Sequence, residues 1–155
     1  MKPLLQRLAE GPLLGDGAMG TMIYARGVFI NRCYDELNLS TPDIVSGIHA
    51  EYVAAGAELL ETNTFGANQI ALAAYGIADK MAAINSRGVE IARAAAGDEV
   101  YVAGCMGPTG RSLGPEGNVS NEEAACAFAS QAQALAAAGA DLIMLDTFHA
   151  LDELI

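Results

Sequence analysis

The stretch Ala54-Ala-Gly-Ala-Glu-Leu59, followed by Thr64-Phe65, recurs later in the chain as Ala137-Ala-Gly-Ala-Asp-Leu142, followed by Thr147-Phe148. Each copy has the pattern of a helix end, a Gly-Ala-acid turn, a short apolar strand and a Thr-Phe tip at the same spacing. Repeated helix–strand units favour a parallel sheet covered by helices. The repeat therefore predicts an α/β fold.

Four apolar segments, each ending in a polar or glycine-rich tip, have the pattern of strands with helices between them. They are Leu13–Gly20, Glu58–Phe65, Val100–Pro108 and Asp141–Phe148. This order predicts a (β/α)8 TIM barrel of which about the first four βα units are present, as one domain over residues 1–155. The sequence ends at Ile155, where a fourth helix begins. We therefore expect half of a barrel and half of its active site.

Three helical regions have clear start and stop signals. The first begins at Thr41-Pro42-Asp43, with proline at the first helical position, and ends at Gly56. The second covers Ala67–Tyr75 and Lys80–Ala96. The third opens with Ser120-Asn121-Glu122-Glu123, a capping-box pattern, and ends at Gly139.

The composition excludes several classes of partner. With 8 basic and 19 acidic residues, the net charge of −11 disfavours nucleic acid and anionic membranes. Apolar runs such as Leu142–Leu145 are far shorter than the roughly 20 residues of a membrane span, and no signal peptide is evident. Cys33, Cys105 and Cys126 form no C-x-x-C pair, so we expect a reducing cytoplasm and no metal site within this chain.

Gly15-Asp-Gly-Ala-Met-Gly20 matches G-x-G-x-x-G, the pattern of a dinucleotide-binding loop. The acidic strand end expected about 20 residues later is missing, since Tyr34–Asn38 is loop-like. Asp16 would also repel a phosphate. Two further interpretations stay open: a tight βα turn, or an amino-acid clamp in which backbone N–H groups meet a carboxylate and Asp16 meets an ammonium.

Further candidates follow from the rule that ligands of parallel sheets lie at the carboxyl ends of the strands. Asp16 and Asp146 could flank one cationic group, although Asp146 is also placed to cap the next helix. Glu61 is assigned to packing or an internal salt bridge. His49 is expected on the outer surface of a helix, and His149 in a plain loop.

The cysteines are not assigned to chemistry. Cys105 lies at a strand tip, but no histidine has a motif relation to it, so it is interpreted as a small buried thiol. Cys33 and Cys126 are interpreted as incidental, with Cys126 inside a helix. No catalytic residue is therefore assigned within this chain.

Four segments in order resemble the homocysteine S-methyltransferase family, in the version that opens cobalamin-dependent methionine synthase. They are Leu14-Gly-Asp-Gly-Ala-Met-Gly-Thr-Met22, Tyr34-Asp-Glu-Leu-Asn-Leu-Ser-Thr-Pro-Asp43, Glu61-Thr-Asn-Thr-Phe-Gly-Ala-Asn68 and Ala103-Gly-Cys-Met-Gly-Pro-Thr-Gly110. The resemblance implies a TIM barrel and a zinc ion, held by three cysteines of the other half barrel, that activates the homocysteine thiol. It also implies a methyl donor such as methylcobalamin, with methyltetrahydrofolate and cobalamin handled by other domains.

Carried over by position, the resemblance assigns Asp16 and Asp146 to the homocysteine amino group. It assigns the N–H groups of Gly17 and Ala18 to the carboxylate, and Phe65 to the pocket wall. The family usually has glutamate where this chain has Asp146.

The same resemblance implies what this chain lacks. None of the implied zinc cysteines is present, so we expect no methyltransferase activity from the chain alone. An open half barrel also leaves strand edges uncovered, so we expect it to pair with the missing C-terminal half or to self-associate. The rival hypotheses are a dinucleotide-binding α/β module and a non-catalytic half barrel that only binds or assembles.

Overall fold

A three-stranded parallel sheet lies at the centre of the computed structural model, which describes residues 1–114 and 117–154. The strands are β1 (Leu59–Glu61), β2 (Tyr101–Met106) and β3 (Leu142–Leu145), in the order β1-β2-β3. The register pairs Glu61 with Ala103 and Cys105 with Met144. All six residues of β2 are buried, as expected for the middle strand of the three.

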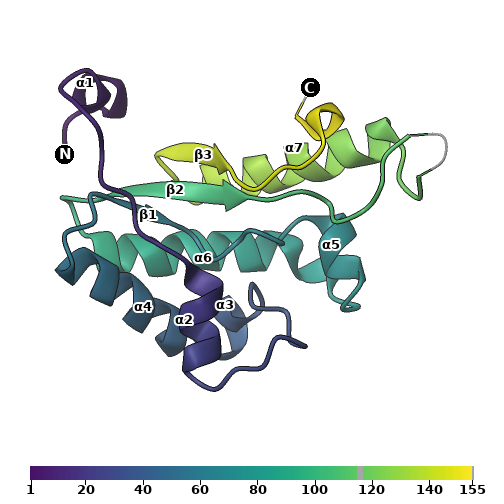
Figure 1. Ribbon diagram of the computed structural model, residues 1–155, viewed down its shortest axis with the longest axis horizontal. Helices are drawn as coiled ribbons and strands as arrows, with labels where there is room; N and C mark the ends of the chain where they lie inside the picture. The colour runs from purple at the N-terminus through teal and green to yellow at the C-terminus, as the bar shows by residue number, and fades with distance from the viewer. Residues whose placement is uncertain (115–116, 155) are drawn as a thin grey trace.

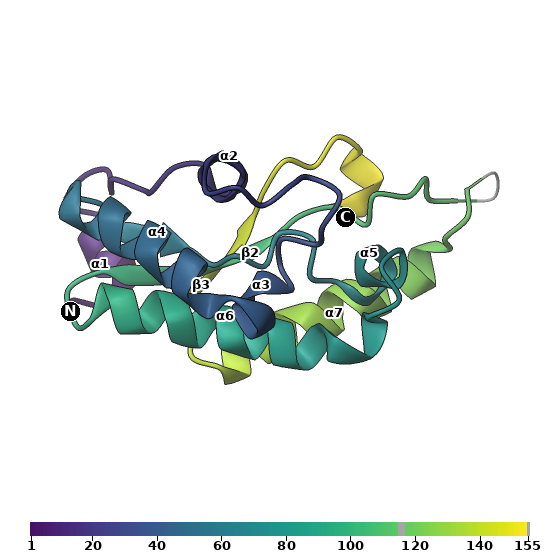
Figure 2. The same ribbon diagram turned by 90° about the horizontal axis from the view of Figure 1, so that it is seen from below.

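Three long helices cover one face of this sheet (Figures 1 and 2). They are α4 (Pro42–Ala54), α6 (Met81–Ala96) and α7 (Asn121–Ala137). α6 connects β1 to β2 and α7 connects β2 to β3, so each crossover brings the chain back to start a parallel strand. The predicted alternation of strand and helix is confirmed.

Shorter helices flank these layers. They are α1 (Leu4–Leu8), α2 (Met19–Ala25), α3 (Leu37–Ser40), α5 (Gln69–Ala73) and the 3-10 turns η1 (Ala78–Lys80) and η2 (Leu151–Glu153). No start or stop signal in the sequence predicted α1, α2 or α3. The predicted loop over residues 107–118 includes residues 115 and 116, which lie outside the described residues.

The helix boundaries follow the local signals closely. Ser120 caps α7 through a complete capping box, in which its hydroxyl accepts from the N–H of Glu123 and the Glu123 carboxylate accepts from the N–H of Ser120. Gly56 and Gly139 follow the ends of α4 and α7 with φ of 102° and 95°, a conformation that favours glycine. Thr41 precedes α4 as expected, although its hydroxyl makes no cap hydrogen bond.

The predicted first strand is much shorter than expected. Gly15 forms a single parallel bridge to Leu59, with the N–H of Asp16 donating to the Leu59 carbonyl at 3.0 Å. The chain then turns into α2 at Met19, so residues 16–20 are not a strand. Gly15, Gly17 and Gly20 weaken the strand preference of residues 13–20, and a turn replaces the ladder.

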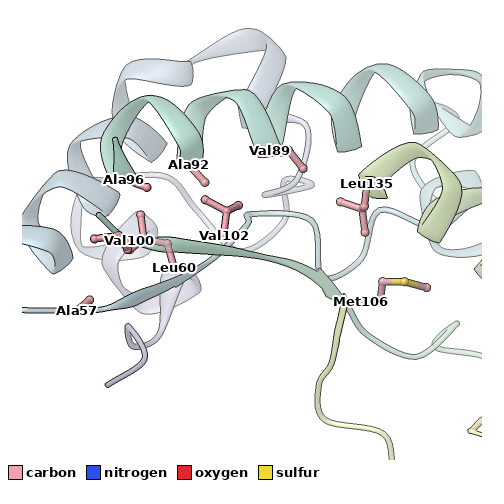
Figure 3. Packing of buried hydrophobic residues seen from close by; sticks show 9 residues of the cluster. All are labelled: Ala57, Leu60, Val89, Ala92, Ala96, Val100, Val102, Met106 and Leu135. Atoms are coloured by element: carbon pink, nitrogen blue, oxygen red, sulfur yellow. The ribbon is translucent and has the colours of Figure 1, made fainter. Parts of the chain in front are cut away.

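The central core lies between α6 and the sheet (Figure 3). Val89, Ala92 and Ala96 of α6 pack on Leu60 and Val102 of the strands. Small side chains on the helix let it approach the sheet closely. At Gly104 of β2 a Cβ would lie 3.0 Å from the Leu135 side chain, so α7 also packs directly on the strand backbone.

Buried side-chain amides hold the segment that follows β1. Asn85 of α6 donates to the Ala67 carbonyl at 2.8 Å, and Gln131 of α7 donates to the Thr64 carbonyl at 2.8 Å. Asn38 of α3 donates to the Asn63 carbonyl at 2.8 Å. These carbonyls have left the sheet ladder, and the amides satisfy them away from water.

His49 lies on α4 as predicted, but its predicted place on the outer surface is wrong. Its side chain is fully buried, and neither ring nitrogen has a partner among the described residues. Burial lowers the pKa of His49 to about 4, because the charged imidazolium would lose its hydration. His49 lies four residues after the buried Val45, so the helix periodicity places both on the side that packs inward.

A search of the described helices for membrane spans found none with the length and apolarity that crossing a bilayer requires.

We predict that Gln131→Ala lowers the free energy of unfolding by about 1–3 kcal/mol, because it leaves the buried Thr64 carbonyl and the Asn85 amide oxygen without their donor. Chemical denaturation monitored by circular dichroism measures the change. Gln133→Ala on the same helix is the control, since Gln133 is exposed and should change stability by less than about 0.5 kcal/mol. Equal losses in the two variants would refute the role of the amide.

We also predict a loss of stability at acid pH that depends on His49. Its folded pKa is depressed to about 4, so the unfolded state takes up the proton first and stability falls as pH drops from about 6.5 towards 4. The full effect is on the order of 3 kcal/mol.

Replacing the ring tests this directly. Because His49→Leu has no ring to protonate, its unfolding free energy relative to that of the parent chain should rise as pH drops from 7 to 4. His149→Leu is the matched control, because His149 is exposed and should leave the profile unchanged. A parent profile that His49→Leu does not alter would contradict the prediction.

Candidate functional site

A cavity of about 730 Å³ lies at the carboxyl ends of the strands. Segments far apart in the sequence meet there, among them the turn after the Gly15 bridge, the segment after β1 and the segment after β3. The five residues predicted to bind a substrate all line it: Asp16, Gly17, Ala18, Phe65 and Asp146. The structure therefore brings together the whole predicted set, and their role in binding stays a prediction.

Backbone groups of β1 hydrogen-bond both the main chain and the side chain of Asp16. Its N–H donates to the Leu59 carbonyl, and its Oδ2 accepts from the N–H of Glu61 at 3.1 Å. Burial raises the pKa of Asp16 to about 7, and this effect outweighs the hydrogen bond from Glu61, which lowers it. Because burial disfavours the ionised form of this carboxyl group, a cation that enters the cavity would stabilise its carboxylate.

The backbone of Gly17 and Ala18 is presented to the cavity. In the described part of the chain neither N–H group has a hydrogen-bond partner. The Tyr52 hydroxyl donates to the Ala18 carbonyl at 3.1 Å, and a Cβ at Gly17 would lie 2.9 Å from that hydroxyl. Because residue 17 is glycine, the Tyr52 side chain can approach this turn and bind the Ala18 carbonyl. The N–H groups of Gly17 and Ala18 are left available to a ligand.

Phe65 forms a partly exposed apolar wall. Its ring is packed on Gly107, where any Cβ would overlap it, and the N–H of Gly107 donates to the Phe65 carbonyl at 2.8 Å. The side chain is 40% exposed, which leaves one face of the ring open to the cavity. The glycine after β2 thus fixes the aromatic residue after β1.

Asp146 directly follows β3, and its N–H donates to the Met106 carbonyl at 2.9 Å. Its Oδ1 accepts from the Thr147 hydroxyl at 2.8 Å. Thr147 has φ of 54°, which is strained for a β-branched residue. The alternative that Asp146 caps the next helix is wrong, because Ala150 occupies the N-cap position of η2.

The assignment of Glu61 to packing or an internal salt bridge needs correction. Glu61 lines the cavity, and it forms no ion pair with any described residue. Its carboxylate lies within 4.8 Å of both the Cys105 sulfur and a carboxylate oxygen of Asp146. As the last residue of β1 it projects from the strand end, a position that the sequence pattern alone does not separate from a buried strand position.

Cys105 is the buried thiol that the sequence predicted, with 4% of its surface exposed. Burial raises the pKa of the Cys105 thiol, and the negative charge of Glu61 raises it further. The thiol is therefore protonated at neutral pH, which agrees with the view that it is no nucleophile. Cys126 lies within a helix, α7, as predicted; its side chain is exposed, whereas Cys33 is buried.

Asp35 also lines the cavity, although the sequence did not predict it as a site residue. Its Oδ1 accepts from the N–H of Gly66 at 2.9 Å, and the Cys33 thiol donates to Oδ2 at 3.6 Å. Burial raises the pKa of Asp35, although the Gly66 N–H lowers it in part. Asp35 lies in a loop without periodic pattern, so only its proximity in the fold identifies it.

The cavity has a strong excess of acidic groups. Four carboxyl groups line it, and Arg32 is the single basic residue among the described lining residues. The Arg32 guanidinium also lies 3.8 Å from the carboxylate of Glu36, outside this set. An environment of this kind favours a positively charged ligand group.

The dinucleotide hypothesis finds little geometric support. Tyr34–Asn38 forms a turn and the start of α3, so no acidic strand end follows the Gly15–Gly20 motif. Asp16 points its carboxylate at the strand end, where a pyrophosphate would have to lie. His149, which follows the cavity segment, is exposed in a loop as predicted.

Comparison with known proteins gives a consistent result. The sequence pattern of the family described as homocysteine S-methyltransferase matches residues 13–155. Methionine synthases of Mycobacterium leprae and Mycobacterium tuberculosis are 37% and 36% identical over 164 residues, covering 97% of this chain. The chain spans 13% and 14% of the length of these two relatives.

Solved structures agree with the fold. The metallated form of the homocysteine methyltransferase MmuM from Escherichia coli superposes with a TM-score of 0.82 at 28% identity, over 99% of this chain and 60% of that chain. The apo form of the same enzyme gives a TM-score of 0.71 at 27% identity. The chain therefore shares an α/β fold with part of that enzyme.

Proposed function

This chain belongs to the homocysteine S-methyltransferase family, and on that premise we propose that its cavity binds the amino-acid end of homocysteine. The observation that carries the proposal is the meeting of Asp16, Gly17, Ala18, Phe65 and Asp146 at one cavity. Residues from three separate segments supply there the three kinds of group that an apolar amino acid needs.

Each part of the ligand has a chemical counterpart. Asp16 and Asp146 bind the ammonium group, because charge-assisted hydrogen bonds to carboxylates are strong in a partly buried site. The free N–H groups of Gly17 and Ala18 receive the carboxylate. Phe65 contacts the side-chain methylenes, and its partly open ring gives an apolar surface for them.

We propose that residues 1–155 form the N-terminal part of a TIM barrel whose parent domain transfers a methyl group to homocysteine. The bridge of Gly15 to β1 and the order β1-β2-β3 support this, since consecutive parallel strands with outer helices build such a barrel. The similarity to methionine synthases favours methylcobalamin as the donor, with methyltetrahydrofolate acting through other domains.

The three-cysteine zinc site that the family implies has no counterpart among the described residues. The nearest donor set is Glu61, Cys105 and Asp146, which has one thiol and two carboxylates in place of three cysteines. We therefore assign no reaction step to zinc within this chain. When bound in the parent domain, zinc would supply the thiolate form of homocysteine. Accordingly, this chain is proposed to bind homocysteine without methylating it.

The two outer strand edges of this half barrel carry exposed apolar side chains that indicate a partner surface. Ile143 and Leu145 of β3 are 36% and 53% exposed, and Leu14 next to the Gly15 bridge is 58% exposed. Apolar side chains on unpaired edges favour association with another sheet. We propose that they pack against the remaining part of the barrel, or against a second copy of this chain when that part is absent.

We predict that Asp16→Asn weakens homocysteine binding by about 10- to 100-fold, since a charge-assisted hydrogen bond contributes about 1.5–3 kcal/mol. Isothermal titration calorimetry with L-homocysteine under reducing conditions measures the affinity. Asp98→Asn removes the same charge from an exposed residue outside the cavity and should leave the affinity unchanged.

The pH dependence gives a second readout of the same site. The pKa of Asp16 is about 7, so affinity for the ammonium should rise between pH 6 and 8 in the parent chain and stay flat in Asp16→Asn. Unchanged affinity in Asp16→Asn would overturn the binding proposal. Methionine formation by the purified chain with a methyl donor and no other protein would contradict its assignment as a binding half.

We predict that the chain associates reversibly through β3. Sedimentation velocity over a range of concentrations should show a concentration-dependent increase in mass, which Leu145→Lys reduces by placing a charge on the exposed edge. Leu5→Lys is the control, because Leu5 is 81% exposed and belongs to helix α1 rather than to a strand. A monomer at all concentrations would rule the edge contact out.

A further inference from the structure

Glu61, Cys105 and Asp146 form a cluster of possible metal ligands at the base of the cavity. Their ligand atoms all lie within 4.8 Å of one another. The three residues belong to three adjacent strand ends: Glu61 ends β1, Cys105 lies in β2 and Asp146 follows β3. The sheet, and not one flexible loop, therefore sets their spacing.

The register explains why these side chains converge. Glu61 pairs with Ala103, which lies two residues before Cys105 on the same face of β2. Cys105 pairs with Met144, which lies two residues before Asp146. Each step along the sheet thus keeps the side chain on the same face while advancing towards the carboxyl ends. This face is opposite to the one that α6 and α7 cover.

The thiol has the environment of a ligand rather than of a core residue. Only 4% of the Cys105 surface is exposed, yet its sulfur lies within 4.8 Å of carboxylate oxygens of Glu61 and Asp146. Within residues 1–114 and 117–154 no other polar group partners this thiol, and no basic side chain pairs with Glu61. Two acidic side chains beside a buried sulfur, with Asp16 and Asp35 lining the same cavity, leave negative charge uncompensated.

We propose that Glu61, Cys105 and Asp146 bind a divalent cation of borderline softness, such as Zn²⁺ or Co²⁺. One thiolate and two carboxylates suit such ions, whereas Mg²⁺ and Ca²⁺ prefer oxygen ligands alone. Ligand atoms around a tetrahedral ion of this size lie about 3.5 Å apart, and the three ligand atoms here lie within 4.8 Å of one another, so small side-chain movements can bring them into range. The thiol proton passes to solvent as the Co–S or Zn–S bond forms.

This site is separate from the cysteine-only zinc centre implied by the family, and it does not rest on the proposed function. It shares Asp146 with the proposed ammonium site. A bound cation would take the carboxylate of Asp146 from an amino-acid ligand, so the two ligands compete for one residue.

Titration of the full chain with Co²⁺ alone tests the proposal. Binding through sulfur produces a thiolate-to-cobalt charge-transfer band in the near ultraviolet, and we expect it to saturate at one ion per chain. Zn²⁺ should abolish the band by competition, and excess Mg²⁺ should not. Absence of a charge-transfer band at saturating Co²⁺ would overturn the proposal.

Matched variants assign the ligands. Cys105→Ser should remove the band, and Cys126→Ser, at an exposed cysteine on α7, should retain it. Glu61→Gln should keep the band but weaken Co²⁺ binding by at least about tenfold, since even groups outside the ligand shell change metal affinity by 10- to 100-fold. Glu61→Gln decides the result if Cys105→Ser does not fold. A band that survives in Cys105→Ser, or an unchanged affinity in Glu61→Gln, would refute the site.

Discussion

The segment that follows β1 is held in place by hydrogen bonds from side-chain amides, which replace the backbone hydrogen bonds of a sheet. Beyond Glu61 the chain leaves the sheet, yet its carbonyls remain buried and must be hydrogen-bonded. Asn38, Asn85 and Gln131 supply the donors from three different helices. Side-chain hydrogen bonds therefore fix the segment 62–68, although it is not a strand. Because each donor comes from a separate element, the segment is fixed only when α3, α6 and α7 are all packed in place.

Close backbone approach is the second part of this constraint. A Cβ at Gly88 of α6 would lie 2.6 Å from Thr64 and 2.8 Å from the Asn38 amide, so the helix can reach the network only with glycine there. The Thr64 hydroxyl in turn donates to the Cys105 carbonyl at 2.7 Å, and the Thr62 hydroxyl accepts from the Cys105 N–H. The position of Cys105 is thus tied to the segment after β1, and through it to the helices.

The sequence predicted the elements that have strong local signals. The capping box at Ser120, the glycines after α4 and α7, and the repeated helix–strand unit were all sufficient to place elements. It failed where tertiary packing decides. The Gly15 segment is reduced to one bridge because its glycines favour a turn, and His49 is buried although histidine on a helix is usually exposed. Asp35 and Glu61 lie in segments that resemble the family, but neither was assigned to the site, because local spacing does not show which side chains meet across strands.

The charge balance of the cavity links its two proposed ligands. An α-amino acid brings one positive and one negative charge, so the free N–H groups at Gly17 and Ala18 can offset its carboxylate while its ammonium offsets one acid. Asp35, which is not assigned to the ammonium group, can stay protonated, because burial raises its pKa. A divalent cation at Glu61, Cys105 and Asp146 would instead neutralise the excess of negative charge in the cavity directly. Because both ligands need Asp146, raising the concentration of one must lower the apparent affinity for the other, as reciprocal linkage requires.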